Sequence, residues 1–317
     1  MLVSRVVGPG ESAVAKFADP VAGPGEAVVL VRACGVCASE FPAWLTGDAK
    51  GSTLGHEVAG EVIAIGPSVS SVRPGDRVTG LLSDGFAEQT VGCAAELVRL
   101  PPGLSFAHAL GEPLGCVMHA IGRLPSLEGM RVAVVGLGFM GLSCLGVLRS
   151  VAAGELVAVS SRAMALERAR NFGASSAVRP DQLNMRDRVA TPRADPFDGG
   201  FDVVIEASGT QGSLDLASEL VAAHGTLLIV GYHQGGSRSV DLALWNWKGL
   251  QVINGHVRRR AEQVEAIVRG VDLIRKGRFS FAPLVTQVMP LTAVDTAFQL
   301  FSKRSSEVVK TVIVPAA

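Results

Sequence analysis

A glycine motif between a strand-like and a helix-like segment constrains the fold of this chain more than any other feature. Residues 131–135 form a short β-branched run typical of a buried strand, and residues 142–151 follow with helical character. In this context the first glycine permits a tight turn, the second lets the backbone approach a pyrophosphate, and the third allows close helix packing. The segment predicts a dinucleotide-binding unit that contacts its cofactor through Gly136, Gly138, Phe139, Met140 and Gly141.

The pattern that follows the glycine motif predicts a doubly wound α/β sheet. Strand-like runs alternate with helix-like segments, which favours parallel strands joined by helices. The predicted strands are 131–135, 156–159, 202–206 and 225–231, and the predicted helices are 116–124, 142–151, 163–172 and 213–223.

The chain before residue 116 has a different character. Short strand-like runs at 27–32, 58–65 and 77–79 are separated by Gly and Pro turns, which predicts a small, partly open β-barrel. After residue 255 the expected elements are helices at 261–276 and 294–302 and a last strand at 309–314. We therefore expect a first domain at 1–116, a nucleotide-binding domain at 117–255, and a tail at 256–317 that returns to the first domain.

Composition excludes several classes of function. The 317 residues are 48% hydrophobic and 18% charged with a formal net charge of +0, so a large core is expected without general attraction to nucleic acid or anionic membrane. No apolar run reaches the roughly 18–20 residues that span a bilayer. The cysteines are odd in number and scattered, and no signal peptide is evident, which predicts a cytoplasmic protein.

The end of the second predicted strand bears on cofactor choice. An acidic residue there would bind the ribose 2′-hydroxyl of NAD, but this chain has Ser160, Ser161 and Arg162. Two hydroxyls and a guanidinium can bind a 2′-phosphate, so the sequence favours NADP(H) over NAD(H). The alternative is that Arg162 faces solvent and Asp181 or another loop acid contacts the ribose.

A second constellation indicates a metal. Cys37 and Ser39 are followed by His56 and Glu57, which places a thiolate, an imidazole and a carboxylate in one short stretch. These groups suit Zn²⁺, which in catalytic sites has three protein ligands and one open position. Cys34 precedes Cys37 by three residues, but no second Cys-x-x-Cys exists, so Cys34 is expected to be a small buried hydrophobe.

These motifs together resemble the zinc-dependent alcohol dehydrogenases of the medium-chain dehydrogenase/reductase family, over essentially the whole length. The resemblance implies a Rossmann domain and a GroES-like β-barrel catalytic domain. It is carried by residues 33–39 (Ala-Cys-Gly-Val-Cys-Ala-Ser), 54–62 (Leu-Gly-His-Glu-Val-Ala-Gly-Glu-Val), 74–78 (Pro-Gly-Asp-Arg-Val) and 85–88 (Gly-Phe-Ala-Glu), together with the glycine motif.

The resemblance also implies the roles of the metal residues. Cys37 and His56 match the first two catalytic zinc ligands. Glu112, in a Glu-Pro-Leu context that resembles the polyol dehydrogenase branch, matches the third, with Cys116 as its competitor. Glu57 matches an acid that is either a fourth or alternating ligand or an acceptor that orients one. The segment that carries a structural zinc in some relatives is missing between residues 78 and 85, so one zinc per chain is expected.

The resemblance also implies residues for proton transfer, for cofactor binding and for substrate binding. Ser39 matches the hydroxyl that passes on the substrate proton, but Pro42 stands where many relatives have the next relay histidine, so the proton leaves through cofactor hydroxyls, water or Glu40. Lys310 matches a basic residue that contacts the pyrophosphate, or is a surface lysine. Trp44 and Leu82 match positions that line the substrate pocket, with core packing as the alternative. His108, His224 and His233 are expected to be ordinary turn or surface residues.

The expected function is zinc-dependent hydride transfer between NADP(H) and a secondary alcohol or ketone, as in a polyol, a sugar or a hydroxylated biosynthetic intermediate. One alternative is a zinc-free NADPH-dependent reductase of activated double bonds or quinones on the same fold. Another is a non-catalytic protein that binds the cofactor. A homodimer or homotetramer is expected, with residues 245–255 supplying an edge strand to the interface.

Overall fold

The computed structural model describes residues 1–150, 153–189, 199–303 and 307–315. The chain forms two compact units. The first contains Met1–Cys116 and Arg258–Ala317, and the second contains Val117–Val257.

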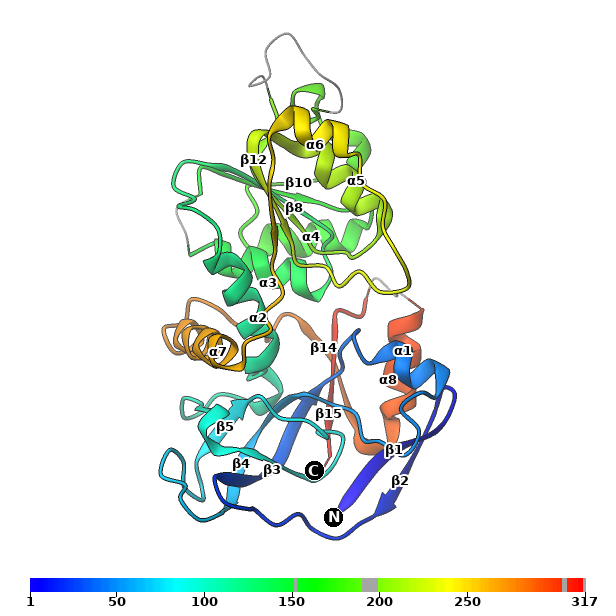
Figure 1. Ribbon diagram of the computed structural model, residues 1–317, viewed down its shortest axis with the longest axis vertical. Coiled ribbons are helices and arrows are strands. Elements are labelled where there is room, and N and C mark those ends of the chain that lie inside the picture. The colour runs from blue at the N-terminus through cyan, green and yellow to red at the C-terminus, as the bar shows by residue number, and fades with distance from the viewer. Residues whose placement is uncertain (151–152, 190–198, 304–306, 316–317) are drawn as a thin grey trace. The chain divides into compact units, whose positions relative to one another are not determined.

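A six-stranded parallel sheet forms the centre of the second unit (Figure 1). Its strand order is β10-β9-β8-β11-β12-β13, so the chain reverses its direction of travel across the sheet between β10 and β11. This confirms the predicted doubly wound sheet, whose carboxyl edge at such a reversal is where ligands bind. The strands are β8 (Arg131–Val135), β9 (Glu155–Val159), β10 (Ser176–Val178), β11 (Phe201–Glu206), β12 (Val221–Ile229) and β13 (Gln251–Asn254).

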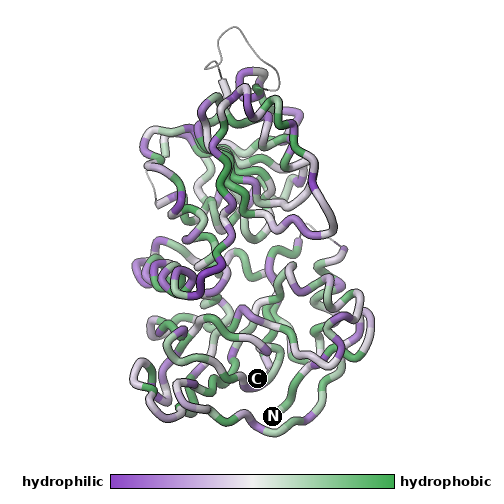
Figure 2. Tube along the Cα trace, in the orientation of Figure 1, coloured by the Kyte–Doolittle hydropathy of each residue, from purple (hydrophilic) through white to green (hydrophobic). Residues whose placement is uncertain are grey.

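Helices cover both faces of this sheet (Figure 1), with α5 and α6 on one side and α3 and α4 on the other. The strands between them are largely apolar (Figure 2), and one core cluster joins Val135 and Val159 of the sheet to Leu214 and Ala217 of α5. The predicted end of the first of these helices, Val151, lies outside the described residues. The helices are α3 (Phe139–Leu148), α4 (Ala163–Asn171), α5 (Gln211–Leu220) and α6 (Leu242–Lys248).

A mostly antiparallel seven-stranded sheet organises the first unit. Its path is β14-β15-β3-β4-β5-β7, with β6 paired to β3, and a separate hairpin is formed by β1 and β2. The predicted strands at 27–32, 58–65 and 77–79 lie within β3, β4 and β5. The strands are β1 (Leu2–Gly8), β2 (Glu11–Lys16), β3 (Glu26–Gly35), β4 (Glu57–Ile65), β5 (Arg77–Gly80), β6 (Gln89–Cys93), β7 (Leu97–Arg99), β14 (Val285–Pro290) and β15 (Lys310–Val314).

The helices of the first unit are α1 (Phe41–Thr46), α7 (Arg260–Arg275) and α8 (Val294–Ser302), and α2 (Gly111–Gly122) begins in the first unit and ends in the second. The sequence predicts that α2 begins at Cys116, but it begins at Gly111. Pro113 is tolerated in a first helical turn, where backbone N–H groups have no helical partner, so the Glu-Pro pair starts the helix instead of preceding it. As a result Glu112 lies in the first turn of α2 and His119 in the last.

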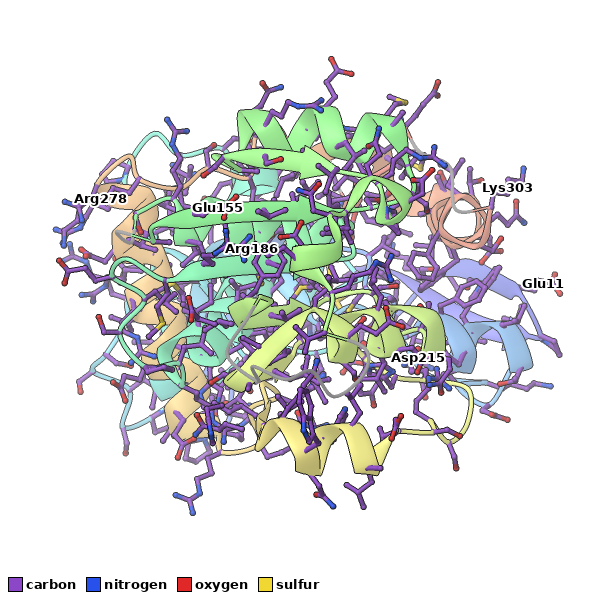
Figure 3. The ribbon with its side chains drawn as sticks, turned by 90° about the horizontal axis from the view of Figure 1, so that it is seen from above. Glu11, Glu155, Arg186, Asp215, Arg278 and Lys303 are labelled. Atoms are coloured by element: carbon purple, nitrogen blue, oxygen red, sulfur yellow. The ribbon has the colours of Figure 1, made fainter. Side chains whose placement is uncertain are left out.

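Short 3-10 turns complete the described structure, at Ala94–Glu96, Phe106–His108, Pro180–Gln182, Met185–Asp187 and Leu291–Ala293. Charged side chains such as those of Glu11, Asp215, Arg278 and Lys303 project from the ribbon into solvent (Figure 3). Within the described ranges, we find no helix that combines the length and the apolar character needed to cross a membrane.

Candidate metal centre and nucleotide site

Three potential metal ligands of the first unit lie together. The ligand atoms of Cys37, His56 and Glu57 are all within 4.8 Å of one another. Cys37 follows the end of β3 and Glu57 begins β4, and the antiparallel pairing of these strands places Gly35 opposite Glu57. A Cβ atom on Gly35 would lie 2.1 Å from Oε2 of Glu57, so the carboxylate occupies the space that glycine leaves.

The imidazole of His56 is held between two acidic groups. Its Nδ1 lies 2.9 Å from Oε1 of Glu40, which also accepts a 2.7 Å hydrogen bond from the backbone N–H of Gly55. Burial by itself lowers the pKa of His56, but hydrogen bonds to Cys37 and Glu40 outweigh it and raise the pKa to about 12. The site therefore strongly favours a cation at this position. A zinc ion bound by Cys37 and the remaining ring nitrogen fits this donor set, while Glu40 orients the ring.

Glu57 is paired with a buried lysine. The Nζ of Lys310 lies 2.6 Å from both carboxylate oxygens and donates a 2.9 Å hydrogen bond to the carbonyl of Val36. Burial lowers the pKa of Lys310, but Glu57 and Cys37 outweigh it, so the pKa lies above its usual value. The sequence predicts that Lys310 contacts a pyrophosphate, whereas the structure buries its ammonium on Glu57. The cause is the pairing of β15 with β3, which carries Lys310 to the end of β3.

Glu112 lies outside this group of three mutually close ligand atoms. Its Oε1 accepts hydrogen bonds from the thiol of Cys116 at 3.3 Å and from Nε2 of Gln263 at 3.0 Å. Burial raises the pKa of Glu112, His56 lowers it and Glu57 raises it further. His56 and Glu57 therefore lie close enough to Glu112 to act on its charge. Burial and the adjacent Glu112 raise the pKa of Cys116 well above its usual value, which favours the neutral thiol in the metal-free protein.

Ser39 and Pro42 are exposed residues that follow Cys37 in the chain. The hydroxyl of Ser39 donates to Sγ of Cys37 at 3.2 Å, and Pro42 lies in the first turn of α1. Glu40, one predicted proton exit, holds His56 and Gly55 instead. This contact is the functional feature that sequence reasoning missed, and only the position of Glu40 next to Ser39 could have indicated it.

Trp44 and Leu82 are core residues of the first unit. Trp44 is 3% exposed, stacks on Phe298 with ring centroids 5.1 Å apart, and donates its indole N–H to Asp295 at 2.8 Å. Leu82 belongs to the same hydrophobic cluster. Both side chains make the contacts of packed residues, so a role in lining the substrate pocket stays a prediction. Cys34 is fully buried in this cluster, which confirms its expected role as a small hydrophobe.

Each glycine of the motif in the second unit is needed for a different structural reason. Gly136 has φ +93°, and a Cβ there would lie 2.6 Å from Cβ of Ser208. A Cβ on Gly141 would lie 1.9 Å from the carbonyl oxygen of Gly136, so α3 packs directly on the turn. At Gly138, the N-cap residue of α3, a Cβ would meet nothing within 4 Å. This open backbone surface at a helix N-terminus fits a pyrophosphate, and Phe139 and Met140 begin the helix behind it.

The residues predicted to select the cofactor lie beside this turn. The backbone N–H of Arg162 donates to Oγ of Ser160 at 3.2 Å, and its guanidinium donates to the carbonyl of Leu137 at 3.3 Å. Ser161 between them is exposed. Asp181, the alternative ribose contact, forms a 3.1 Å ion pair with Arg179, and this hydrogen bond lowers its pKa. The hydroxyls and the guanidinium thus lie next to the glycine turn, and Asp181 is paired elsewhere.

Comparison with known proteins assigns both units. Residues 23–108 match the "Alcohol dehydrogenase GroES-like domain" model, and residues 140–270 match the "Zinc-binding dehydrogenase" model. Sorbitol dehydrogenase of Rattus norvegicus is 25% identical over 341 aligned positions, covering 94% of this chain and 92% of the relative. (R,R)-butanediol dehydrogenase of Bacillus subtilis (strain 168) is 26% identical and covers 92% and 93%.

A solved structure supports the same assignment. An alcohol dehydrogenase from Thermus sp. ATN1 superimposes with a TM-score of 0.84 at 26% identity and covers 100% of both chains. The GroES-like domain and the Rossmann sheet expected from the sequence are thereby confirmed. From its fold, its clustered ligands and these relatives, the chain belongs to the zinc-binding alcohol dehydrogenase family of medium-chain oxidoreductases.

Proposed function

We propose that this protein transfers hydride between NADP(H) and a secondary alcohol or ketone, using one zinc ion per chain. The observation that carries this proposal is the cluster of Cys37, His56 and Glu57, whose ligand atoms all lie within 4.8 Å of one another. Glu40 and Cys37 bond to this imidazole and the carboxylate of Glu57 lies beside it, and such a set of donors suits a divalent metal.

We assign Cys37 and His56 as ligands and Glu112 as the third. Glu57 is closer to the other two ligand atoms, but Lys310 already offsets its charge. The hydrogen bonds that Glu112 accepts in the described structure come from the neutral groups of Cys116 and Gln263. A bound cation would stabilise the carboxylate and so lower its raised pKa. Glu57 is then an alternating ligand. Replacement of Zn²⁺ by Co²⁺ tests this, because Glu112→Gln should change the visible spectrum more than Glu57→Gln does.

When bound, zinc supplies a Lewis acid that polarises the alcohol or carbonyl oxygen and lowers the pKa of the alcohol. The protein side of the reaction is proton movement at Ser39. The hydroxyl of Ser39 is exposed and donates to Cys37, so it can accept the substrate proton and pass it to a water or a cofactor hydroxyl. Ser39→Ala should therefore lower kcat by about 10²–10⁴-fold, the usual contribution of one proton-transfer group, with zinc content unchanged.

The preference for NADP(H) rests on Ser160, Ser161 and Arg162. Their hydroxyls and guanidinium complement a 2′-phosphate, and no acid follows β9 at this point. The test compares kcat/KM for NADP⁺ and NAD⁺ in the parent protein and in Arg162→Ala. NADP⁺ should be preferred by the parent, and the variant should lose that preference. A parent protein that prefers NAD⁺ contradicts the assignment.

The substrate class follows from the relatives. Sorbitol dehydrogenase and (R,R)-butanediol dehydrogenase are named for alcohols with neighbouring hydroxyls, which favours polyols, sugars or hydroxylated biosynthetic intermediates. A panel of polyols, amino sugars and cyclic ketones, with zinc measured per chain, tests the whole assignment. Activity that survives complete removal of the metal would favour a zinc-free reductase, and two zinc ions per chain would contradict the single site.

Association through β13 is part of the proposal. This strand is the last of the parallel sheet, and Val252 on it is 39% exposed. An exposed strand edge with an apolar side chain favours pairing with a second copy across a two-fold axis. Light scattering of Val252→Lys should then show a smaller species than the parent, which we expect to be a homodimer or homotetramer.

A further inference from the structure

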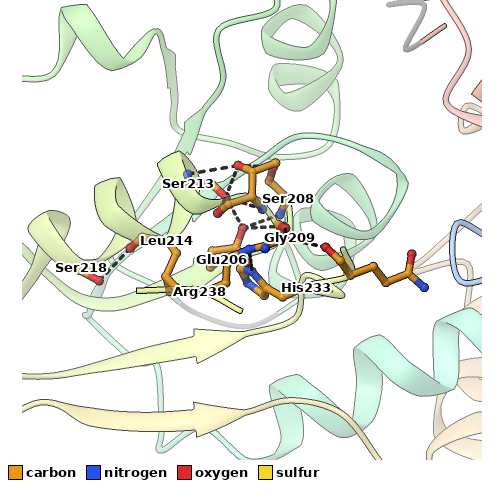
Figure 4. Close-up of polar contacts among 10 residues, drawn as sticks. Glu206, Ser208, Gly209, Ser213, Leu214, Ser218, His233 and Arg238 are labelled. Carbon is orange, nitrogen blue, oxygen red and sulfur yellow. Dashed lines mark hydrogen bonds and ion pairs between the residues drawn. The ribbon is translucent and has the colours of Figure 1, made fainter. Parts of the chain in front are cut away.

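A buried carboxylate at the carboxyl end of β11 joins three segments of the second unit (Figure 4). Glu206 has no exposed surface, and its Oε1 accepts 2.8 Å hydrogen bonds from the backbone N–H groups of Ser208 and Gly209. The same oxygen accepts a 2.6 Å bond from the hydroxyl of Ser213 in α5, and Oε2 lies 2.9 Å from Nε2 of His233. The turn after β11, the start of α5 and the loop after β12 therefore share one anchor.

Arg238 completes the array from within that loop. Its Nε donates to Nδ1 of His233 at 3.2 Å, and its terminal nitrogens donate to the carbonyls of Gly209 at 3.1 Å and Gln234 at 2.7 Å. Because Nδ1 of His233 accepts from a guanidinium, the hydrogen bond to Glu206 is donated by Nε2. Arg238 thus acts on the buried carboxylate of Glu206 through His233, which the sequence predicts to be an ordinary turn or surface residue.

The array lies where the sheet receives ligands. A dinucleotide crosses the carboxyl edge of such a sheet, with one nucleotide on each half, and β11 and β12 belong to the half beyond the glycine turn. Backbone segments meet closely here: a Cβ on Gly231 would lie 2.4 Å from Oε2 of Glu206, and one on Gly209 would lie 2.7 Å from the carbonyl of Tyr232. Ser208 also packs on Gly136 of the glycine turn.

We propose that Arg238, acting through His233 and Glu206, positions the backbone of residues 207–209 and 231–233 as the wall that receives the nicotinamide half of the cofactor. Arg238 and His233 are positioning residues, and the adenine half, on β8 and β9, does not depend on them. A wall held in its bound shape loses less conformational freedom when the ligand binds, so the array contributes to cofactor affinity without a contact of its own. The inference rests on one part of the proposed function, which is that the protein binds a nicotinamide dinucleotide.

The test separates the two halves of the cofactor. Dissociation constants are measured for NADPH, by its fluorescence, and for adenosine 2′,5′-bisphosphate, which is the adenine half alone. In Arg238→Met the constant for NADPH should rise about tenfold, which corresponds to 1.4 kcal/mol, and the constant for the fragment should stay unchanged. If NADH proves the tighter cofactor, NADH and AMP take their places.

Arg188→Met is the matched control. Arg188 donates to Glu219 at 2.5 Å and to the carbonyl of Pro180 at 2.7 Å, so it is bonded much as Arg238 is. Glu219 lies near the end of α5 and Ser213 near its start, which places this arginine at the opposite end of the helix. The control should bind NADPH and the fragment as the parent does.

Variants of His233 test whether Arg238 acts on Glu206 through this histidine. His233→Gln keeps an Nε2 donor for Glu206 and an oxygen acceptor for Arg238, so it should bind NADPH nearly as the parent does, whereas His233→Leu should behave as Arg238→Met. If Arg238→Met does not fold, the same two dissociation constants are measured for Arg238→Lys. The single ammonium of lysine cannot make all the hydrogen bonds that the guanidinium makes to His233, Gly209 and Gln234.

Unchanged NADPH binding in the Arg238 and His233→Leu variants would overturn the inference, as would an equal loss for NADPH and the fragment. A parent protein that binds neither NADPH nor NADH would instead remove the proposed function.

Discussion

The ammonium of Lys310 lies 2.6 Å from the carboxylate of Glu57, and their side chains are only 5% and 1% exposed. Glu57 also supplies one of the three ligand atoms that lie together at the metal centre. Removal of either charge alone leaves the other buried and unpaired, which is far more costly than removal of both. The pair therefore fixes both the stability of the first unit and the net charge beside the metal.

Lys310→Met should lower the free energy of unfolding by about 3–5 kcal/mol, because it leaves the Glu57 carboxylate buried without its partner. Urea denaturation of the metal-free protein measures this loss. Glu57→Gln should also destabilise, and the double variant should lose less than the sum of the two. Binding of NADPH to Lys310→Met should be unchanged. Full stability with weakened NADPH binding would instead support the pyrophosphate contact that the family resemblance implies.

Glu40 should govern metal affinity through the orientation of His56. Acceptors that hold a metal-bound histidine typically contribute 10–100-fold to metal affinity, so Glu40→Ala should weaken zinc binding by about that factor. Glu40→Gln keeps an oxygen near Nδ1 and should weaken it less. Competition with a chromogenic chelator measures both constants, which are compared after correction for the proton that zinc displaces from His56.

Glu61→Gln is the control for Glu40, since Glu61 is 38% exposed and its ion-pair partner is Arg32 at 3.7 Å. Its zinc affinity should equal that of the parent protein. Equal affinities in Glu40→Ala and the parent would show that His56 is oriented by other contacts.

Local patterns predicted four strands of the parallel sheet, β8, β9, β11 and β12, because each carries its own apolar signal, whereas the three-residue β10 (Ser176–Val178) was missed. A short β-branched run indicates a buried strand without knowledge of its neighbours, and the predicted strands 131–135 and 202–206 each lie within one residue of the bounds of β8 and β11. The β1–β2 hairpin was missed because the apolar residues of β1 come in pairs and those of β2 are few, so neither strand shows a clear alternation. The start of α2 was missed because the Glu-Pro-Leu segment was interpreted only as a zinc-ligand motif that resembles the polyol dehydrogenase branch, and the helix was predicted from Cys116.

The side-chain partners at the metal centre could not be predicted in this way. Lys310 contacts Glu57 because β15 pairs with β3, and these two residues are 253 positions apart in the chain. Glu40 contacts His56 because α1 folds back on the loop before β4, at a separation of 16 positions. Neither contact leaves a periodic pattern, so only the tertiary pairing reveals it.

Zinc affinity should rise with pH because binding displaces a proton from His56. In the metal-free protein the pKa of His56 is about 12, against an ordinary value of 6.5. A raised pKa means that the stabilisation from this protonated imidazole is fully present below pH 6.5 and is lost as the pH rises toward 12. Between pH 6.5 and 8.5 the zinc association constant should therefore increase at least about tenfold per pH unit.

Calorimetry in two buffers of different ionisation enthalpy counts the protons that zinc releases, and at least one should appear at pH 7.5. Glu40→Gln removes a group that helps raise the pKa of His56, so its pH dependence should level off at lower pH. A zinc affinity that is constant from pH 6.5 to 8.5 would show that His56 is not a cation before the metal binds.

Lys248 caps a helix from a fully buried position. This last residue of α6 is 0% exposed, and its Nζ donates to the carbonyls of Ser218 at 2.6 Å, Glu219 at 3.0 Å and Val221 at 2.7 Å. These carbonyls end α5, where unpaired acceptors and the negative end of the helix dipole favour a cation. Lys248→Met fills the same space but leaves the carbonyls without this donor, so it should cost about 2–4 kcal/mol of stability.

Lys276→Met is the control for Lys248, because Lys276 is 53% exposed and its ion-pair partner is the surface residue Asp272. Thermal unfolding of the zinc-loaded protein should show a lower midpoint for Lys248→Met and an unchanged midpoint for Lys276→Met. Zinc content should be equal in both variants, since Lys248 and its three acceptors all belong to the second unit and the metal ligands to the first. A Lys248→Met protein as stable as the parent would mean that water or a shifted side chain satisfies the carbonyls of α5 as well as the ammonium does.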